Sequence, residues 1–97
     1  MIEQSKIQKE IIEIIRLLLA QDDKNTEIYI DTPLLGGDSD LDSMKLVELC
    51  LKLEDKALEM GFEFDWTSEK AMSKAGSMFR TVDTLAEEFT KQNRIAK

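Results

Sequence analysis

Hydrophobic residues recur at three- and four-residue steps in three parts of the chain, which is the spacing of one face of an α-helix. The three parts are residues 3–20, 43–59 and 81–92. Their regularly spaced apolar residues are Ile7, Ile11, Ile14, Ile15 and Leu18, then Leu46, Leu49, Cys50, Leu53 and Ala57, and finally Val82, Leu85, Ala86 and Phe89. The pattern predicts three main helices whose apolar faces share one core.

A long connection, residues 21–42, separates the first two of these helices. It contains turn-forming residues (Asn25, Pro33 and Gly36-Gly37) and few apolar ones (Ile28, Ile30, Leu34 and Leu35). The alternation Ile28-Tyr29-Ile30 is compatible with a short strand. Because the surroundings are helical, it favours a loop pinned to the core by its apolar side chains.

A fourth, shorter helix is predicted over residues 67–76, after an aromatic segment in which Phe62, Phe64 and Trp66 alternate with acidic residues. Thr67-Ser68-Glu69 is a typical helix start, and Gly76 is expected to end the regular part. The last helix is expected to begin at Thr81 as its cap, with a frayed polar tail after it. The prediction is therefore an all-α fold, a four-helix bundle in a single domain spanning 1–97.

The charge, the residue types and the length of the chain argue against several classes of function. The chain has 97 residues and a net charge of −7, which argues against binding nucleic acid and favours basic partners. Histidine is absent and Cys50 is the only cysteine, so zinc clusters, internal disulfides and Cys–His nucleophiles are not expected. The chain is also short for an enzyme cleft between lobes. No apolar run is long enough to span a bilayer and the start does not read as a signal peptide, so we expect a cytoplasmic protein.

The most informative stretch is residues 42–55, which places one serine at the mouth of an amphipathic helix. Asp42 and Ser43 are both favoured capping residues, and good helix formers follow as far as Gly61. A group attached to Ser43 would lie at a helix N-terminus, where free N–H groups and the helix dipole favour an anion. The plainer interpretation of these few residues is that Ser43 is only a helix cap.

This stretch resembles the prosthetic-group site of acyl carrier proteins, in which Asp-Ser-Leu precedes a helix of the form x-x-Val-Glu-Leu-x-x-x-Leu-Glu. Met44 replaces the usual leucine, and the matching residues are Val47, Glu48, Leu49, Leu53 and Glu54. The Thr-Pro-Leu-like segment Asp31-Thr32-Pro33-Leu34 also suits the family. The resemblance implies a 4′-phosphopantetheine arm on Ser43 that carries an acyl or aminoacyl thioester, and an acyl-carrier-like bundle. It implies a non-catalytic carrier protein, which holds intermediates and catalyses nothing itself. It also implies a phosphopantetheinyl transferase and acyl-loading and synthase enzymes as partners of a monomeric carrier.

In that family, partner enzymes dock on an apolar stripe beside the serine and on acids next to it. Here the stripe would be Met44, Val47 and Leu51, and the acids Glu48, Glu54 and Asp55. The plainer interpretations are a core rim and an ordinary solvated helix face. The family often has acidic or small residues where this chain has Lys45, Lys52 and Lys56. This departure leaves the partner set open.

The region after Gly61 is longer than in usual carriers, and its large apolar residues are candidates for a cargo pocket. The candidate lining consists of Leu46, Cys50, Phe62, Phe64, Trp66 and Met72, with Met78 and Phe79 nearby in sequence. The alternative is that these residues only complete the core. Cys50 is expected to be a small buried apolar residue without a redox role.

Three functions therefore remain open. The first is a stand-alone acyl carrier of a specialised lipid, fatty acid or secondary-metabolite pathway. The second is an aminoacyl or peptidyl carrier that uses the same bundle and serine. The third is a small helical adapter that carries no prosthetic group.

Overall fold

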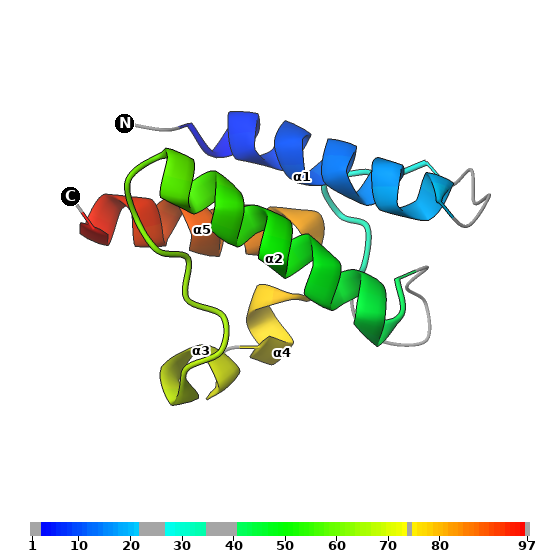
Figure 1. Cartoon of the computed structure of the whole chain (residues 1–97). Coiled ribbons are helices and arrows are strands. Elements are labelled where there is room, and N and C mark those ends of the chain that lie inside the picture. Colours follow the sequence, from blue (N-terminus) through cyan, green and yellow to red (C-terminus); the bar gives the residue numbers. More distant parts are fainter. Residues whose placement is uncertain (1–2, 22–26, 35–40, 74, 97) are drawn as a thin grey trace.

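The computed structural model describes residues 3–21, 27–34, 41–73 and 75–96 of the chain (Figure 1). The helices of these ranges are α1 (Gln4–Ala20), α2 (Ser43–Glu59), α3 (Glu69–Ser73), α4 (Ala75–Met78) and α5 (Val82–Ala96). The described residues contain no strand, only an isolated antiparallel bridge between Pro33 and Thr81. The predicted all-α class is thus confirmed.

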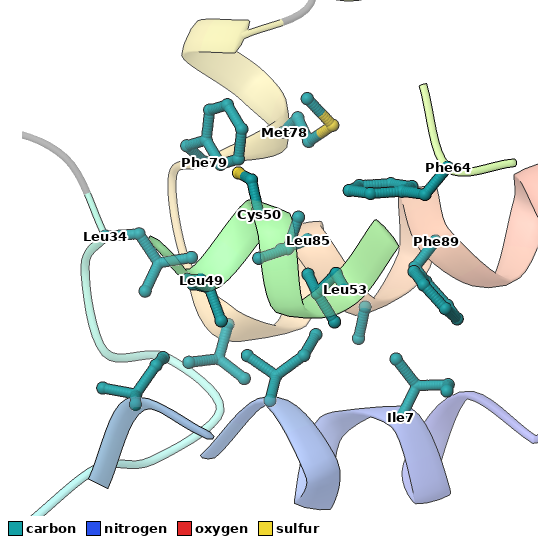
Figure 2. Close-up of a cluster of buried hydrophobic side chains, with 14 of the residues drawn as sticks. Ile7, Leu34, Leu49, Cys50, Leu53, Phe64, Met78, Phe79, Leu85 and Phe89 are labelled. Carbon is teal, nitrogen blue, oxygen red and sulfur yellow. The ribbon is translucent and has the colours of Figure 1, made fainter. Parts of the chain in front are cut away.

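The three long helices enclose one hydrophobic core. In Figure 1, α1 lies across the top and α2 runs obliquely below it in front of α5, and α1 packs against both of the others. Ile7, Ile11, Ile15 and Leu18 of α1 are fully buried, as their spacing predicts. They meet apolar side chains of α2 and α5 in the cluster of Figure 2, which includes Leu49, Cys50, Leu53, Leu85 and Phe89. Lys56 on α2 also pairs with Glu10 on α1 at 2.6 Å.

Helix α2 ends in a Schellman motif at Gly61. The Gly61 N–H donates to the carbonyl of Leu58 at 3.1 Å, and the Phe62 N–H donates to the carbonyl of Ala57 at 3.0 Å. Gly61 has φ +90°, a conformation that side chains other than that of glycine rarely adopt. The motif turns the chain back so that Phe62 enters the core next to the helix that it follows.

The region predicted as a helix over 67–76 is helical over Glu69–Ser73 and Ala75–Met78, and Lys74 between them lies outside the described residues. The hydroxyl of Ser68 accepts the N–H of Ala71 at 3.1 Å, so Ser68 caps α3 and Thr67 lies outside it. Gly76, expected to end this helix, lies inside α4. Met78 at the end of α4 and the following Phe79 are both buried in the core.

The last helix starts as predicted but ends later. Thr81 and Thr84 form a reciprocal cap: the Thr84 N–H donates to Thr81 Oγ1 at 3.2 Å, and the Thr81 N–H donates to Thr84 Oγ1 at 2.9 Å. The prediction of a frayed end after residue 92 is wrong, because α5 continues to Ala96. Asn93 in this last part is almost completely buried, and its side-chain amide has no hydrogen-bond partner among the described residues.

The loop before α2 is attached to the start of α5. The carbonyls of Ile30 and Thr32 accept the N–H groups of Asp83 and Val82, at 2.8 and 3.3 Å. Two of the loop's apolar residues, Ile28 and Leu34, are buried, whereas Ile30 is exposed. The loop is therefore pinned to the core as predicted, but by fewer side chains.

Several predicted features lie outside the described residues, namely Asn25, Leu35, Gly36-Gly37 and Ser39. Within the described ranges, none of the helices combines the length and the apolar content needed to cross a bilayer.

Candidate functional site

The start of α2 is fixed by Asp42. Its side chain accepts the backbone N–H of Lys45 at 2.8 Å, and its carbonyl accepts the N–H of Leu46 at 3.0 Å. The preceding Leu41 is buried and anchors the approach to the helix. Ser43 is therefore the first residue of a capped helix, where backbone N–H groups favour a negative charge. The Ser43 side chain lies outside what the structure describes.

An apolar stripe faces outward along α2 from this point. Met44 is 75% exposed, Val47 44% and Leu51 48%, so these residues are not a core rim. Leu58, further along α2 and not singled out from the sequence, is 63% exposed. The stripe of Met44, Val47 and Leu51 is an uncovered apolar surface directly beside Ser43.

Two of the three lysines that depart from the family pattern form pairs within the chain. Lys45 lies 3.6 Å from Glu48 and 3.4 Å from the amide oxygen of Gln21, and its side chain is mostly buried. Lys56 pairs with Glu10. Lys52 remains exposed on the solvent side of α2. Through its contact with Gln21, Lys45 links the start of α2 to the end of α1.

Acidic side chains surround a hollow of about 640 Å³ between the second half of α2 and the segment after it. Glu54 and Asp55 come from α2, and Glu63 and Asp65 come from the following segment, with Leu58, Phe64 and Thr67 completing the wall. Glu54 and Asp55 were predicted as partner-binding acids. The structure brings them close to Glu63 and Asp65, which the sequence did not suggest.

The expected cargo pocket is not assembled in this structure. Phe62 and Phe64 are buried and pack against Phe89, with ring centroids 5.1 and 5.2 Å apart. Met72 is 62% exposed and does not reach this cluster. Leu46 and Trp66 are half-buried at its edge. The large side chains that were candidates for a pocket lining therefore mainly fill the core.

Cys50 is buried on the apolar face of α2, as expected. Figure 2 shows its sulfur pointing toward Phe79 and Met78. Burial raises the pKa of the Cys50 thiol to about 12, and the nearby Glu54 carboxylate adds to the effect. The thiol is therefore neutral and lacks the exposure that a reactive cysteine needs.

Asp65 organises the segment before α3. Its carboxylate accepts the hydroxyl of Ser68 at 2.5 Å and the Ser68 N–H at 3.1 Å. These hydrogen bonds hold the pKa of Asp65 below its usual value. Its backbone also pairs with the side chain of Gln92, a residue that no pattern in the sequence singles out.

In the part of the chain that the structure describes, no group of three or more acidic or cysteine side chains is arranged to hold a metal ion. Comparisons with protein-family models, with curated proteins and with solved structures found no match to this chain.

Proposed function

We propose that this protein is an acyl carrier that holds acyl intermediates as thioesters on a 4′-phosphopantetheine arm attached to Ser43. The observation that carries the proposal is the capped start of α2 at Ser43, followed directly by an exposed apolar stripe. An apolar side chain as exposed as that of Met44 adds nothing to the core. It makes sense as a contact for another molecule.

The helix terminus supports a phosphodiester at this residue. The arm would be joined through a phosphate, and the first turn of α2 provides N–H groups and a positive dipole end for it. Asp42 already accepts one of these N–H groups, that of Lys45. The reactive thiol of such an arm belongs to the prosthetic group, so the protein itself needs no catalytic residue.

The surface of α2 supports docking by basic partner enzymes. The apolar stripe supplies contact area, and Glu48, Glu54 and Asp55 supply negative charge beside it. Lys56 pairs with Glu10 of α1 and so leaves these three acids unpaired by it, whereas Lys45 lies 3.6 Å from Glu48 and partly neutralises that carboxylate. We expect a phosphopantetheinyl transferase and acyl-loading and synthase enzymes to approach this face.

A second candidate is an aminoacyl or peptidyl carrier. It is favoured by the packing of Phe62 and Phe64 on Phe89, which fills the region where an aliphatic chain would be sheltered. A polar aminoacyl group needs no such shelter. The third candidate, an adapter without a prosthetic group, would use the same apolar stripe and leave Ser43 unmodified.

The mass of the intact protein purified from its own host tests the proposal. We expect a species heavier than the bare chain by one arm, with or without cargo, and the mass of the cargo separates the acyl from the aminoacyl candidate. A Ser43→Ala variant produced in the same host is the control and should show only the bare mass. Identical masses for the two chains, once the substitution is allowed for, would favour the adapter.

A further inference from the structure

The side chain of Gln92 on α5 binds both backbone groups of Asp65. Its Oε1 accepts the Asp65 N–H at 2.6 Å, and its Nε2 donates to the Asp65 carbonyl at 2.9 Å. The same Nε2 donates to the Glu88 carboxylate at 2.9 Å, which fixes the orientation of the amide. The amide of Gln92 thus accepts one hydrogen bond from the Asp65 backbone and donates another to it, as a neighbouring strand would. These two bonds attach the segment before α3 to α5.

The segment after this contact, residues 65–73, is held together mainly by its own hydrogen bonds. Asp65 binds Ser68, the Ser68 hydroxyl accepts the Ala71 N–H, and the Ser68 carbonyl accepts the Met72 N–H at 2.8 Å. Among the helices, α3 packs chiefly on α4, and Figure 1 shows it standing away from the three long helices. Its exposed surface and few buried side chains are typical of units that open independently of a core.

The chain on the N-terminal side of this segment is firmly anchored. Phe62 and Phe64 are buried against Phe89, and the Schellman motif at Gly61 joins them to α2. By contrast, Trp66 is only half-buried, and its Nε1 has no hydrogen-bond partner among the described residues. The boundary between anchored and weakly held chain therefore lies next to the backbone groups that Gln92 binds.

Hollows flank this boundary on both sides. One of about 250 Å³ lies toward α5 and is lined by Lys70 and Ala71 together with Gln92 and Ile95. The acidic hollow described above lies toward α2 and is lined by Thr67. Asp65 lines both. Displacing residues 65–73 would therefore join two existing hollows and uncover the edge of the core at Phe64.

We propose that residues 65–73 form a flap that opens as a unit away from α2 and α5, and that the side chain of Gln92 is its latch. Opening breaks the two hydrogen bonds between Gln92 and Asp65 and withdraws Trp66, while Phe62 and Phe64 stay in the core. The inference stands apart from the proposed carrier function, since it concerns the unmodified chain. If the carrier function holds, the open flap is the route by which an apolar cargo reaches the core.

Amide hydrogen exchange followed by NMR on the unmodified full chain tests the latch. In Gln92→Ala, we expect the Ser68, Ala71 and Met72 amides to exchange at least about tenfold faster, the effect of losing two hydrogen bonds. Gln92 touches none of these three amides, so their exchange reports opening of the flap. Gln92→Glu keeps the size of the side chain but removes the donor to the Asp65 carbonyl, and it should act in the same direction.

Arg94→Ala, a substitution at an exposed position of α5 that lines neither hollow, is the matched control and should leave the three amides unchanged. Iodide quenching of Trp66, the only tryptophan, should rise in both Gln92 variants. Faster exchange of the Asp65 amide alone would mean only that this amide lost its acceptor, and would overturn the flap. Uniform acceleration through α1 and α2, or α3 amides already unprotected in the wild-type chain, would overturn it as well.

Discussion

Asp42 accepts the backbone N–H of Lys45 with its carboxylate at 2.8 Å, and this hydrogen bond sets the start of α2 immediately before the modification candidate Ser43. The residue thus has a structural role that is separate from any contact with an enzyme. In a carrier, the same carboxylate would lie next to the point of attachment. The two roles can be distinguished because only the structural one affects the bare chain.

Replacing Asp42 by alanine should lower the free energy of unfolding by about 1 kcal/mol, the usual effect of losing a helix cap. Asp42→Asn keeps a capping oxygen and should be close to the wild-type chain. Urea unfolding followed by circular dichroism measures both, and Asp55→Ala, at an exposed position of the same helix, is the control. A loss in Asp42→Asn as large as in Asp42→Ala would show that the charge, and not the cap, stabilises this helix end.

The apolar stripe and the core side of α2 should respond differently to the same substitution. Leu51 is half exposed, so Leu51→Ala should change the free energy of unfolding by less than about 1 kcal/mol. Leu53 is fully buried, and Leu53→Ala should cost about 2–5 kcal/mol. Urea unfolding compares the two. If Leu51→Ala proved as costly as Leu53→Ala, Leu51 would belong to the core and could not serve as a contact for partners.

Reversing the charge of Glu48 should slow transfer of the arm to Ser43 without changing helix content. Glu48 lies beside the apolar stripe. Glu48→Lys therefore puts a positive charge where a basic partner enzyme is expected to dock, and the two positive charges repel each other. The rate of transfer to the wild-type chain should fall with added salt, because salt screens the attraction. Glu59→Lys, at the far end of α2, is the matched control. Equal rates for both variants, together with rates independent of salt, would remove this surface from recognition.

The Cys50 thiol should be nearly inert in the folded chain. Its pKa is raised from 9.0 to about 12, so at pH 8–9 it should react slowly with maleimide and rapidly once urea unfolds the protein. The raised pKa also sets a pH dependence. The unfolded chain loses the thiol proton first, so this contribution to stability is complete below pH 9.0 and is lost between pH 9.0 and about 12. Fast labelling under native conditions would mean that α2 opens readily around this residue.

The hydrophobic spacing predicted the long helices because each has an apolar face that only a shared core can bury. The caps at Asp42 and Thr81 were also predictable, since capping depends on residues three positions apart. The place of α3 away from the three long helices was not predictable, because it depends on contacts between residues distant in sequence and not on local spacing. The pairing of Gln92 with Asp65 joins residues 27 positions apart, and no local pattern indicates it.

For the candidate site, the sequence placed the stripe of Met44, Val47 and Leu51 correctly on the outside of α2, as the spacing from its buried residues implies. It failed for Met72, which was grouped with the aromatic residues because it is apolar and near them in sequence. In the structure α3 points this side chain outward. Apolar character alone does not show on which side of a short helix a residue lies.

The most direct test of the carrier proposal is incubation of the bare chain with coenzyme A and a phosphopantetheinyl transferase, followed by peptide mapping by mass spectrometry. The account predicts one added arm, mapped to Ser43, with none on Ser43→Ala and normal loading of Ser39→Ala. Ser39 is the informative comparison, because it also follows an aspartate and lies only four residues upstream. An arm on Ser39, or no arm under conditions that load another carrier protein in parallel, would contradict the account.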